Sequence, residues 1–219
     1  MTERLRGARD KENRRENILD AAEAVFFERG FDRAPMDEIA RRAGISRALL
    51  YVYFTDKAAI MRGIMLRAID SMCRRFEQAV ADGATGLAQL RGIGRAYYAF
   101  SRDESDYFDV LTNMNTFPAS GEDDEQVRQL RERAAYSTRL MVEAMENGLS
   151  DGSLAADRVR SPLQTAYFLQ GALHGVIMQT RGPHSPVDEG GEPGISDREE
   201  AEQLVLYAID MLGRAIRSD

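Results

Sequence analysis

The sequence is poor in the residues from which disulfide frameworks, metal sites and most hydrolytic active sites are built. Its 219 residues contain one cysteine, Cys73, and two histidines, His174 and His184. A single cysteine excludes an intramolecular disulfide framework and suits a reducing compartment. There is no His/Cys metal spacing, no glycine-rich phosphate loop that opens a helix, and no nucleophile elbow. We therefore expect no catalytic residues, no metal ligands and no cofactor, and the chain is interpreted as a non-enzyme.

Long apolar segments are missing too. No stretch approaches the roughly 18 apolar residues that a membrane-spanning helix requires, and the opening residues MTERLRGARD contain no apolar signal-peptide core. With 43% hydrophobic and 30% charged residues, the composition is typical of a folded, soluble protein. We therefore expect a cytoplasmic protein with no membrane partner.

The two-residue alternation of β-strands is also absent, and every periodic segment has helical spacing, which predicts an all-α fold. Helices are expected over residues 13–29, 36–43, 47–53, 57–81, 87–101, 103–117, 122–147 and 162–181, with a last one after Ser196. Asn13 and Glu16 form a capping box at the first start, and Ser120 is the expected cap of the helix at 122–147. The expected organisation is a flexible basic arm (1–12), a three-helix head (13–57) whose connector helix begins near residue 56, and a helical body (58–219) with a flexible loop at 182–195.

The segment Met36–Lys57 predicts a helix-turn-helix, the DNA-reading unit in which two short helices cross closely. Gly44 can adopt the left-handed conformation that ends the first helix, and Ser46 is a good cap for the second. Small Ala40 allows the two helices to approach. Residues 1–62 carry a slight excess of basic side chains although the whole chain has a net charge of −7, so one end of the molecule is compatible with DNA.

The second helix of this unit is interpreted as the recognition helix. Arg47 is the candidate for a bidentate contact with guanine, and Ala48 and Leu49 can touch a thymine methyl group. The expected DNA-binding residues are Ser46, Arg47, Ala48, Leu49, Tyr51, Tyr53, Lys57 and Arg42. Two of these have structural alternatives: Lys57 is either a phosphate contact or an ordinary surface lysine, and Arg42 also suits the dipole of the preceding helix. The basic residues of the arm either reach DNA or form a solvated tail.

Aromatic and methionine side chains recur on the helices of the body. Each is expected in the core, and together they can also line an apolar pocket for a small effector. The candidates are Phe76, Tyr97, Phe100, Phe108, Met114, Phe117, Met141, Met145, Tyr167 and His174. The predicted helix 162–181 is apolar on nearly all sides, which indicates that it meets a partner subunit as well as its own core. Gly171, Ala172 and Gly175 would let another helix approach closely.

The head resembles the N-terminal domain of the TetR (tetracycline-repressor-like) family of bacterial transcription regulators. The resemblance runs without a gap from about Ile18 to Met65 and rests on ILDAAEAVFFERGFD, on IARRAGIS and on LYVYFTDK. Two departures stand out. Ala34-Pro35 replaces the usual Thr or Ser before the second helix, and Ala48-Leu49 replaces the usual Gly-Thr, so two polar phosphate contacts of the family pattern are lost.

The resemblance implies a homodimer in which the last two helices of each subunit form a four-helix bundle, and it implies two recognition helices in successive major grooves of a pseudo-palindromic operator. The residues assigned to the dimer interface are Tyr167, Gly171, Ala172, Gly175, Val205, Ala208 and Leu212. The expected function is a repressor that leaves double-stranded DNA when a small, mostly apolar effector, unknown from the sequence, binds the body. The alternative is a DNA-binding protein of the same fold that answers to a protein partner or to no small molecule. A helical enzyme or adaptor with an incidental helix-turn-helix is a third hypothesis, which the missing catalytic set disfavours.

Overall fold

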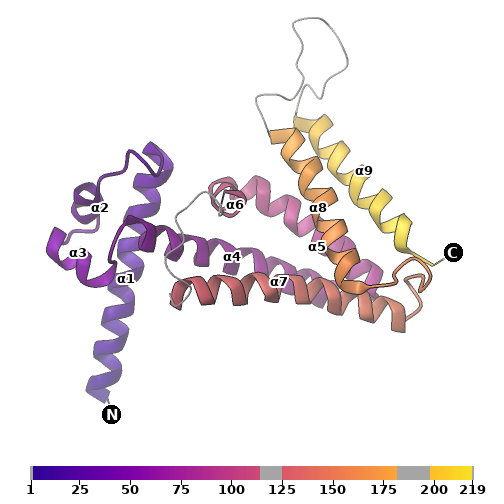
Figure 1. The fold of residues 1–219 in the computed structure, drawn as a ribbon, viewed down its shortest axis with the longest axis horizontal. Helices are drawn as coiled ribbons and strands as arrows, with labels where there is room; N and C mark the ends of the chain where they lie inside the picture. Colours follow the sequence, from indigo (N-terminus) through magenta and orange to yellow (C-terminus); the bar gives the residue numbers. More distant parts are fainter. Residues whose placement is uncertain (1, 114–124, 182–197, 219) are drawn as a thin grey trace, which may run out of the picture. The chain divides into compact units, whose positions relative to one another are not determined.

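The computed structural model describes residues 2–113, 125–181 and 198–218, and within these ranges every regular element is a helix (Figure 1), which confirms the all-α prediction. The helices are α1 (Thr2–Arg29), α2 (Met36–Arg42), α3 (Arg47–Tyr53), α4 (Lys57–Asp82), α5 (Gly86–Asp103), α6 (Ser105–Thr112), α7 (Glu125–Ser150), α8 (Pro162–Arg181) and α9 (Arg198–Ile216). An isolated antiparallel bridge joins Leu154 to Arg217. None of the helices in the described ranges is long and apolar enough to span a bilayer.

The chain folds into two compact units whose boundary differs from the predicted one. Unit 1 comprises residues 1–68 and 109–131, and unit 2 comprises residues 69–108 and 132–219. The division therefore falls within α4 rather than at its start. The reason lies in contacts between α4 and α7: the Gln126 amide donates to the Ala59 carbonyl oxygen over 3.1 Å and accepts from the Arg62 guanidinium over 3.4 Å. These bonds draw the start of α7 into unit 1.

The core of unit 1 is built from one face of α1 together with the inner sides of α2, α3 and α4, and α2 and α3 lie beside α1 (Figure 1). Its fully buried side chains include Ile18, Leu19, Ala22, Val25, Ile39, Leu50, Ile60 and Ile64. On the polar side, Arg67 of α4 binds the carboxylates of Glu16, Asp20 and Glu23 on α1 at 2.6 to 2.8 Å. An apolar contact and an ionic one therefore fix α4 to α1.

The predicted start of α1 at Asn13 was wrong, because the helix begins at Thr2 and includes the predicted flexible arm. The extra residues are mostly Glu, Arg, Lys and Ala, which have a high propensity for helix. The end of α2 at Gly44 was predicted correctly, and Gly30 ends α1 in the same way. Gly30 and Gly44 have φ of 79° and 66°, the left-handed conformation that ends α1 and α2 without the steric cost of a side chain.

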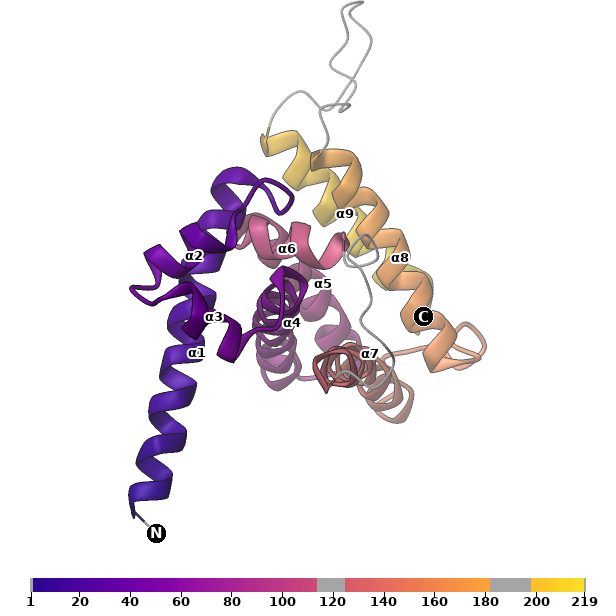
Figure 2. The same cartoon turned by 60° about the vertical axis from the view of Figure 1, so that its left-hand side comes forward.

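In unit 2, α8 and α9 lie side by side and antiparallel in both views (Figure 1 and Figure 2), with α5 packed against both. Helix α8 has the predicted bounds, whereas α6 ends at Thr112 instead of residue 117. The caps predicted at Ser120 and Ser196 and the predicted loop 182–195 lie outside the described residues, as do Met114 and Phe117.

Candidate nucleic-acid interface and ligand cavity

Helix α3 is held by a cap at one end and by two apolar anchors. The Ser46 hydroxyl accepts a hydrogen bond from the Leu49 backbone N–H at 3.2 Å, as the sequence predicted. Leu50 is fully buried and Phe54, directly after the helix, is 3% exposed. With these residues turned inward, the opposite face of α3 is fixed in orientation and presented to solvent.

The outward face of α3 carries most of the predicted DNA-binding residues. Ser46, Arg47, Ala48, Tyr51 and Val52 are exposed, whereas Leu49 and Tyr53 are half-buried. Val52, at 71% exposure, is the most exposed large apolar side chain in the described residues. It was not among the predicted site residues, although its position between Tyr51 and Tyr53 on the helix could have indicated it. An exposed valine beside an arginine and a tyrosine is a surface suited to a partner rather than to water.

Arg47 lies at the surface, where it contacts Asp37 and the ring of Tyr51. Its guanidinium is 3.1 Å from a carboxylate oxygen of Asp37 on α2 and 5.7 Å from the centroid of the Tyr51 ring. The side chains of Arg47 and Asp37 are 60% and 65% exposed, so this ion pair is screened by water and contributes little to stability. The arginine can therefore exchange Asp37 for another acceptor at low cost.

Arg42 was expected to contact DNA, and in the structure its side chain binds two carboxylates of unit 1. It forms a two-pronged pair with the Glu28 carboxylate of α1, with one contact at 2.7 Å, and it also binds Glu38 at 3.2 Å. Its guanidinium group keeps the pKa of the Glu28 carboxyl below its usual value. Arg42 thus joins the end of α2 to α1 through both of its terminal nitrogens.

Lys57 was expected to bind a phosphate at the start of α4. Its ammonium group instead donates to the carbonyl oxygens of Phe31 at 2.7 Å and Asp32 at 3.1 Å, and the Ala34 carbonyl oxygen is 3.5 Å away. The cation also lies 4.6 Å from the centroid of the Phe31 ring. A lysine ammonium has three donors, so these carbonyl groups occupy it. The anion at the start of α4 is instead the cap Asp56, whose carboxylate accepts from the Ala59 N–H at 2.7 Å.

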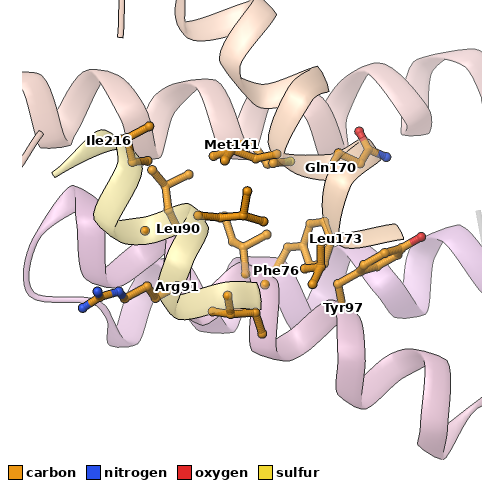
Figure 3. Close-up of a pocket in the computed structure, with 14 residues that line it drawn as sticks. Phe76, Leu90, Arg91, Tyr97, Met141, Gln170, Leu173 and Ile216 are labelled. Carbon is orange, nitrogen blue, oxygen red and sulfur yellow. The ribbon is translucent and has the colours of Figure 1, made fainter. Parts of the chain in front are cut away.

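Unit 2 contains an apolar cavity of about 600 Å³, its open mouth included. Five helices contribute to its walls, and its lining residues are Phe76, Leu90, Arg91, Ile93, Gly94, Tyr97, Met141, Leu169, Gln170, Leu173, Ile209, Leu212, Gly213 and Ile216. Figure 3 shows Tyr97 and Gln170 at one end of the labelled group and Leu90, Arg91 and Ile216 at the other. The cavity is therefore lined mainly by apolar side chains and has polar groups at its two ends.

The predicted effector residues divide between this cavity and the core. Phe76, Tyr97 and Met141 line it. Phe100, Phe108 and Met145 do not, because they are at most 1% exposed and pack inside unit 2. Tyr167 is 61% exposed on the outer side of α8. Leu90, Ile93, Leu173 and Ile209 were missed, because aliphatic residues at helical spacing indicate a core and do not distinguish a filled core from a hollow one.

His174 contacts Tyr97, one of the residues that line the cavity. Its Nδ1 lies 2.8 Å from the Tyr97 hydroxyl oxygen, and its ring centroid is 5.8 Å from that of Phe108. Burial raises the pKa of Tyr97 well above its usual value and lowers the pKa of His174 below its usual value. Both side chains are therefore neutral at pH 7. In the described ranges, no group of three His, Cys, Asp or Glu side chains is placed to hold a metal ion.

The outer face of α8 and α9 is apolar and exposed. Its large side chains are Leu163, Tyr167, Phe168, Met178, Leu206, Tyr207 and Met211, and we call this set the α8–α9 face. A Cβ atom added at Gly171 or Gly175 would meet nothing within 4 Å. Val205 was assigned to a dimer interface wrongly, because it is fully buried in its own chain. Leu212 lines the cavity, and Ala172 and Ala208 are half-buried.

The head matches a known protein family. Residues 18–64, which contain α2, α3 and the cap of α4, match the family described as bacterial regulatory proteins, tetR family. The N-terminal segment of the chain is therefore similar to the DNA-binding region of TetR-family regulators. Similar solved structures share the fold of the chain over nearly the whole length. One is SmeT, the repressor of the Stenotrophomonas maltophilia multidrug efflux pump SmeDEF, with a TM-score of 0.67 and 22% identity over 94% of this chain and 91% of that one. Another is the TetR-family transcriptional regulator PfmR from Thermus thermophilus, with a TM-score of 0.63 and 18% identity over 90% and 97%.

Two of the sequence relatives are a transcriptional activator and a transcriptional repressor. The HTH-type transcriptional activator FasR of Mycolicibacterium smegmatis is 33% identical over 101 residues, which is 46% of each chain. The HTH-type transcriptional repressor KstR2 of Rhodococcus jostii is 26% identical over 154 residues, 67% of this chain and 71% of KstR2. The chain thus spans less than half of FasR and somewhat more than two thirds of KstR2.

Proposed function

We propose that this protein is a dimeric, DNA-binding transcriptional regulator that represses from a pseudo-palindromic operator and is released by a small, mostly apolar effector. One observation carries the proposal: α3 is capped, anchored by Leu50 and Phe54, and presents Arg47, Ala48, Tyr51 and Val52 outward within the segment that matches the family. A rigid short helix with an exposed arginine and small apolar side chains fits the major groove.

The proposed contacts follow from what each side chain offers. Arg47 would leave Asp37 and donate twice to guanine, and Ala48 and Val52 would meet thymine methyl groups. The hydroxyl groups of Tyr51 and Tyr53 would donate to phosphates. Arg42 and Lys57 would support this surface from within unit 1, since both side chains already bind other groups of that unit.

Dimerisation is proposed through the α8–α9 face. Seven large apolar side chains on two neighbouring helices form a surface of the kind that monomers rarely leave in water. Gly171 and Gly175 lie on α8 with open space before them, so a helix of a second subunit can approach closely. Two subunits related by a two-fold axis would place two recognition helices on successive turns of one face of DNA.

Effector control is proposed because one helix takes part in both units. Ile60 and Ile64 of α4 belong to the core of unit 1, and Phe76 of the same helix lines the cavity of unit 2. A ligand that favours one arrangement of Phe76 would therefore bias α4 and shift the population of DNA-binding dimers. Repression is preferred to activation because the longer of the two alignments is with a repressor, KstR2.

DNase footprinting on the DNA that flanks the gene tests the proposal. The expected result is a protected pseudo-palindrome whose half-sites lie about one helical turn apart. Absence of protection at low salt, where charge attraction is strongest, would sink the DNA-binding function. The alternative, control by a protein partner or by no small molecule, is favoured instead if a protected site exists and no apolar compound releases the protein from it.

A further inference from the structure

We propose that the cavity of unit 2 selects an uncharged ligand, largely apolar, with a single hydroxyl or carbonyl group held at the end formed by Tyr97 and Gln170. This inference rests on the function proposed above, because it names the chemical class of the effector. It goes further in excluding carboxylates and phosphates from the cavity and in assigning the ligand's orientation.

The walls of the cavity offer a ligand mainly apolar contacts. All lining residues other than Arg91, Tyr97 and Gln170 are apolar. A ligand that fills this space gains free energy mainly by removing apolar surface from water. An ionised group carried into such walls would lose its hydration, which is costly unless a counter-ion is present. The charge of the ligand therefore depends on whether Arg91 is available.

Arg91 already has an acidic partner, Asp210, which it shares with Arg214. Its Nη2 lies 3.1 Å from one carboxylate oxygen of Asp210, and the other oxygen of Asp210 binds Arg214 at 2.7 Å. Its Nε has no hydrogen-bond partner but is covered by α9, since a Cβ atom on Gly213 would come within 2.7 Å of it. Figure 3 shows the guanidinium group turned away from the other labelled side chains. An anion in the cavity would thus have to compete with Asp210.

The opposite end is polar and also neutral. The Tyr97 hydroxyl pairs with Nδ1 of His174 at 2.8 Å, and burial disfavours the ionised form of both. The Tyr97 O–H donates to Nδ1 when the imidazole proton is on Nε2, and Nδ1–H donates to the Tyr97 oxygen when it is on Nδ1. In either tautomer the Tyr97 oxygen keeps a lone pair for a ligand hydroxyl. The Gln170 amide, at the exposed edge of the cavity, adds both a donor and an acceptor. This pair of groups recognises a hydroxyl or carbonyl without needing charge.

A matched pair of competitors tests whether the cavity prefers an uncharged ligand. The full chain, without DNA, is titrated with the neutral dye N-phenyl-1-naphthylamine, and the bound dye is displaced with 1-decanol or with decanoate. These competitors have the same chain length and differ in the head group. We expect the dye to brighten on binding and decanol to displace it at a concentration at least about tenfold lower than decanoate, the least discrimination expected for an unpaired buried group. Equal or better displacement by decanoate would overturn the proposal and assign the ligand head to Arg91.

A pair of glycine variants tests the location. A Cβ atom on Gly94 would lie 3.4 to 3.6 Å from Leu173 and Ile209, which is ordinary contact, so Gly94→Ala adds a methyl group to the cavity wall without strain. Gly7→Ala makes the same change on α1, with nothing within 4 Å of the new atom. Gly94→Ala is expected to weaken decanol binding about tenfold, and Gly7→Ala to leave it unchanged. Unchanged binding in Gly94→Ala would place the probe elsewhere and overturn the proposal.

These measurements are independent of the operator. Failure to bind neutral probes, combined with a normal footprint, would refute the ligand class and leave the regulator standing. Selective decanol binding without any footprint would support the cavity and refute the proposed DNA-binding function.

Discussion

The Lys57 ammonium group donates to the Phe31 carbonyl oxygen over 2.7 Å and lies 4.6 Å from the centroid of the same residue's ring. A cation in the first turn of a helix is disfavoured by the helix dipole. Here the carbonyl oxygens of the segment between α1 and α2 supply the compensating negative charge. Lys57 therefore links the start of α4 to the segment that leads into α2. Through this link it helps to fix the orientation of the helix-turn-helix.

Replacing Lys57 by methionine is expected to lower the free energy of unfolding by about 1–2 kcal/mol, because charge-assisted hydrogen bonds to backbone oxygens are lost. Urea titration followed by circular dichroism measures this. Arg41→Met is the matched control: Arg41 is 73% exposed with one surface ion pair to Glu38 at 3.6 Å, so its loss should cost less than about 0.5 kcal/mol.

The same variant decides between support and phosphate contact. DNA binding by Lys57→Met should weaken for all sequences alike, while the dependence of log affinity on log salt keeps its slope. Loss of one phosphate contact per subunit would instead reduce that slope by about 0.9 for each contact. A reduced slope with unchanged stability would show that the ammonium group reaches DNA after all.

Arg47 and Asp37 should respond in opposite directions. Arg47→Ala removes the proposed guanine contact, so the ratio of operator to random-sequence affinity should fall by about tenfold or more. Asp37→Asn releases Arg47 from its 3.1 Å ion pair and removes a negative charge from the DNA side, so affinity should rise. Gel-shift titrations against operator and scrambled DNA measure both. Equal effects of Arg47→Ala on the two DNAs would mean that Arg47 contacts only the backbone.

Local signals in the head predicted α2, α3 and the start of α4, but not the start of α1. Ser46 and Asp56 are caps because their short side chains accept backbone N–H groups, and Gly44 ends α2 because it tolerates a positive φ. These effects act within a few residues and are visible in sequence. The carbonyl groups that bind Lys57 could not be predicted from the sequence, because they lie 23 to 26 positions before it. The same holds for the pair of Arg42 with Glu28, which lies 14 positions before it. Only the packing of α1 against the helix-turn-helix brings them together.

The cavity was harder to predict for a related reason. Phe76, Tyr97 and Met141 were expected there, but Phe100 and Phe108 have the same character and lie in the core. Which apolar residues enclose empty space depends on where small residues fall between helices. Gly94 and Gly213 mark this place in the structure, and nothing in their immediate sequence separates them from glycines elsewhere in the chain.

The α8–α9 face predicts the oligomeric state. Phe168 and Tyr207 are 63% and 62% exposed, so changing both to serine should leave the subunit folded and yield a monomer in sedimentation velocity. Val52→Ser alters a side chain that is 71% exposed on α3 and should leave the dimer intact. A dimer that persists in the double variant would show that another surface holds the subunits together. Loss of operator binding in the monomer is expected as well, because each half-site alone binds weakly.

The pair formed by His174 and Tyr97 predicts a dependence of stability on pH. Burial lowers the pKa of His174 below its usual 6.5, so the unfolded chain binds its proton at a higher pH than the folded chain does. The stabilisation is thus complete above about pH 6.5 and is lost as the pH falls through the folded-state value. His174→Gln cannot take up this proton, and its amide can still accept from the Tyr97 hydroxyl. Thermal unfolding at pH 7.5 and pH 5.5 should therefore show a smaller acid-induced decrease in the variant than in the native chain. Equal decreases would place the acid sensitivity in other groups, such as the carboxylates that bind Arg67.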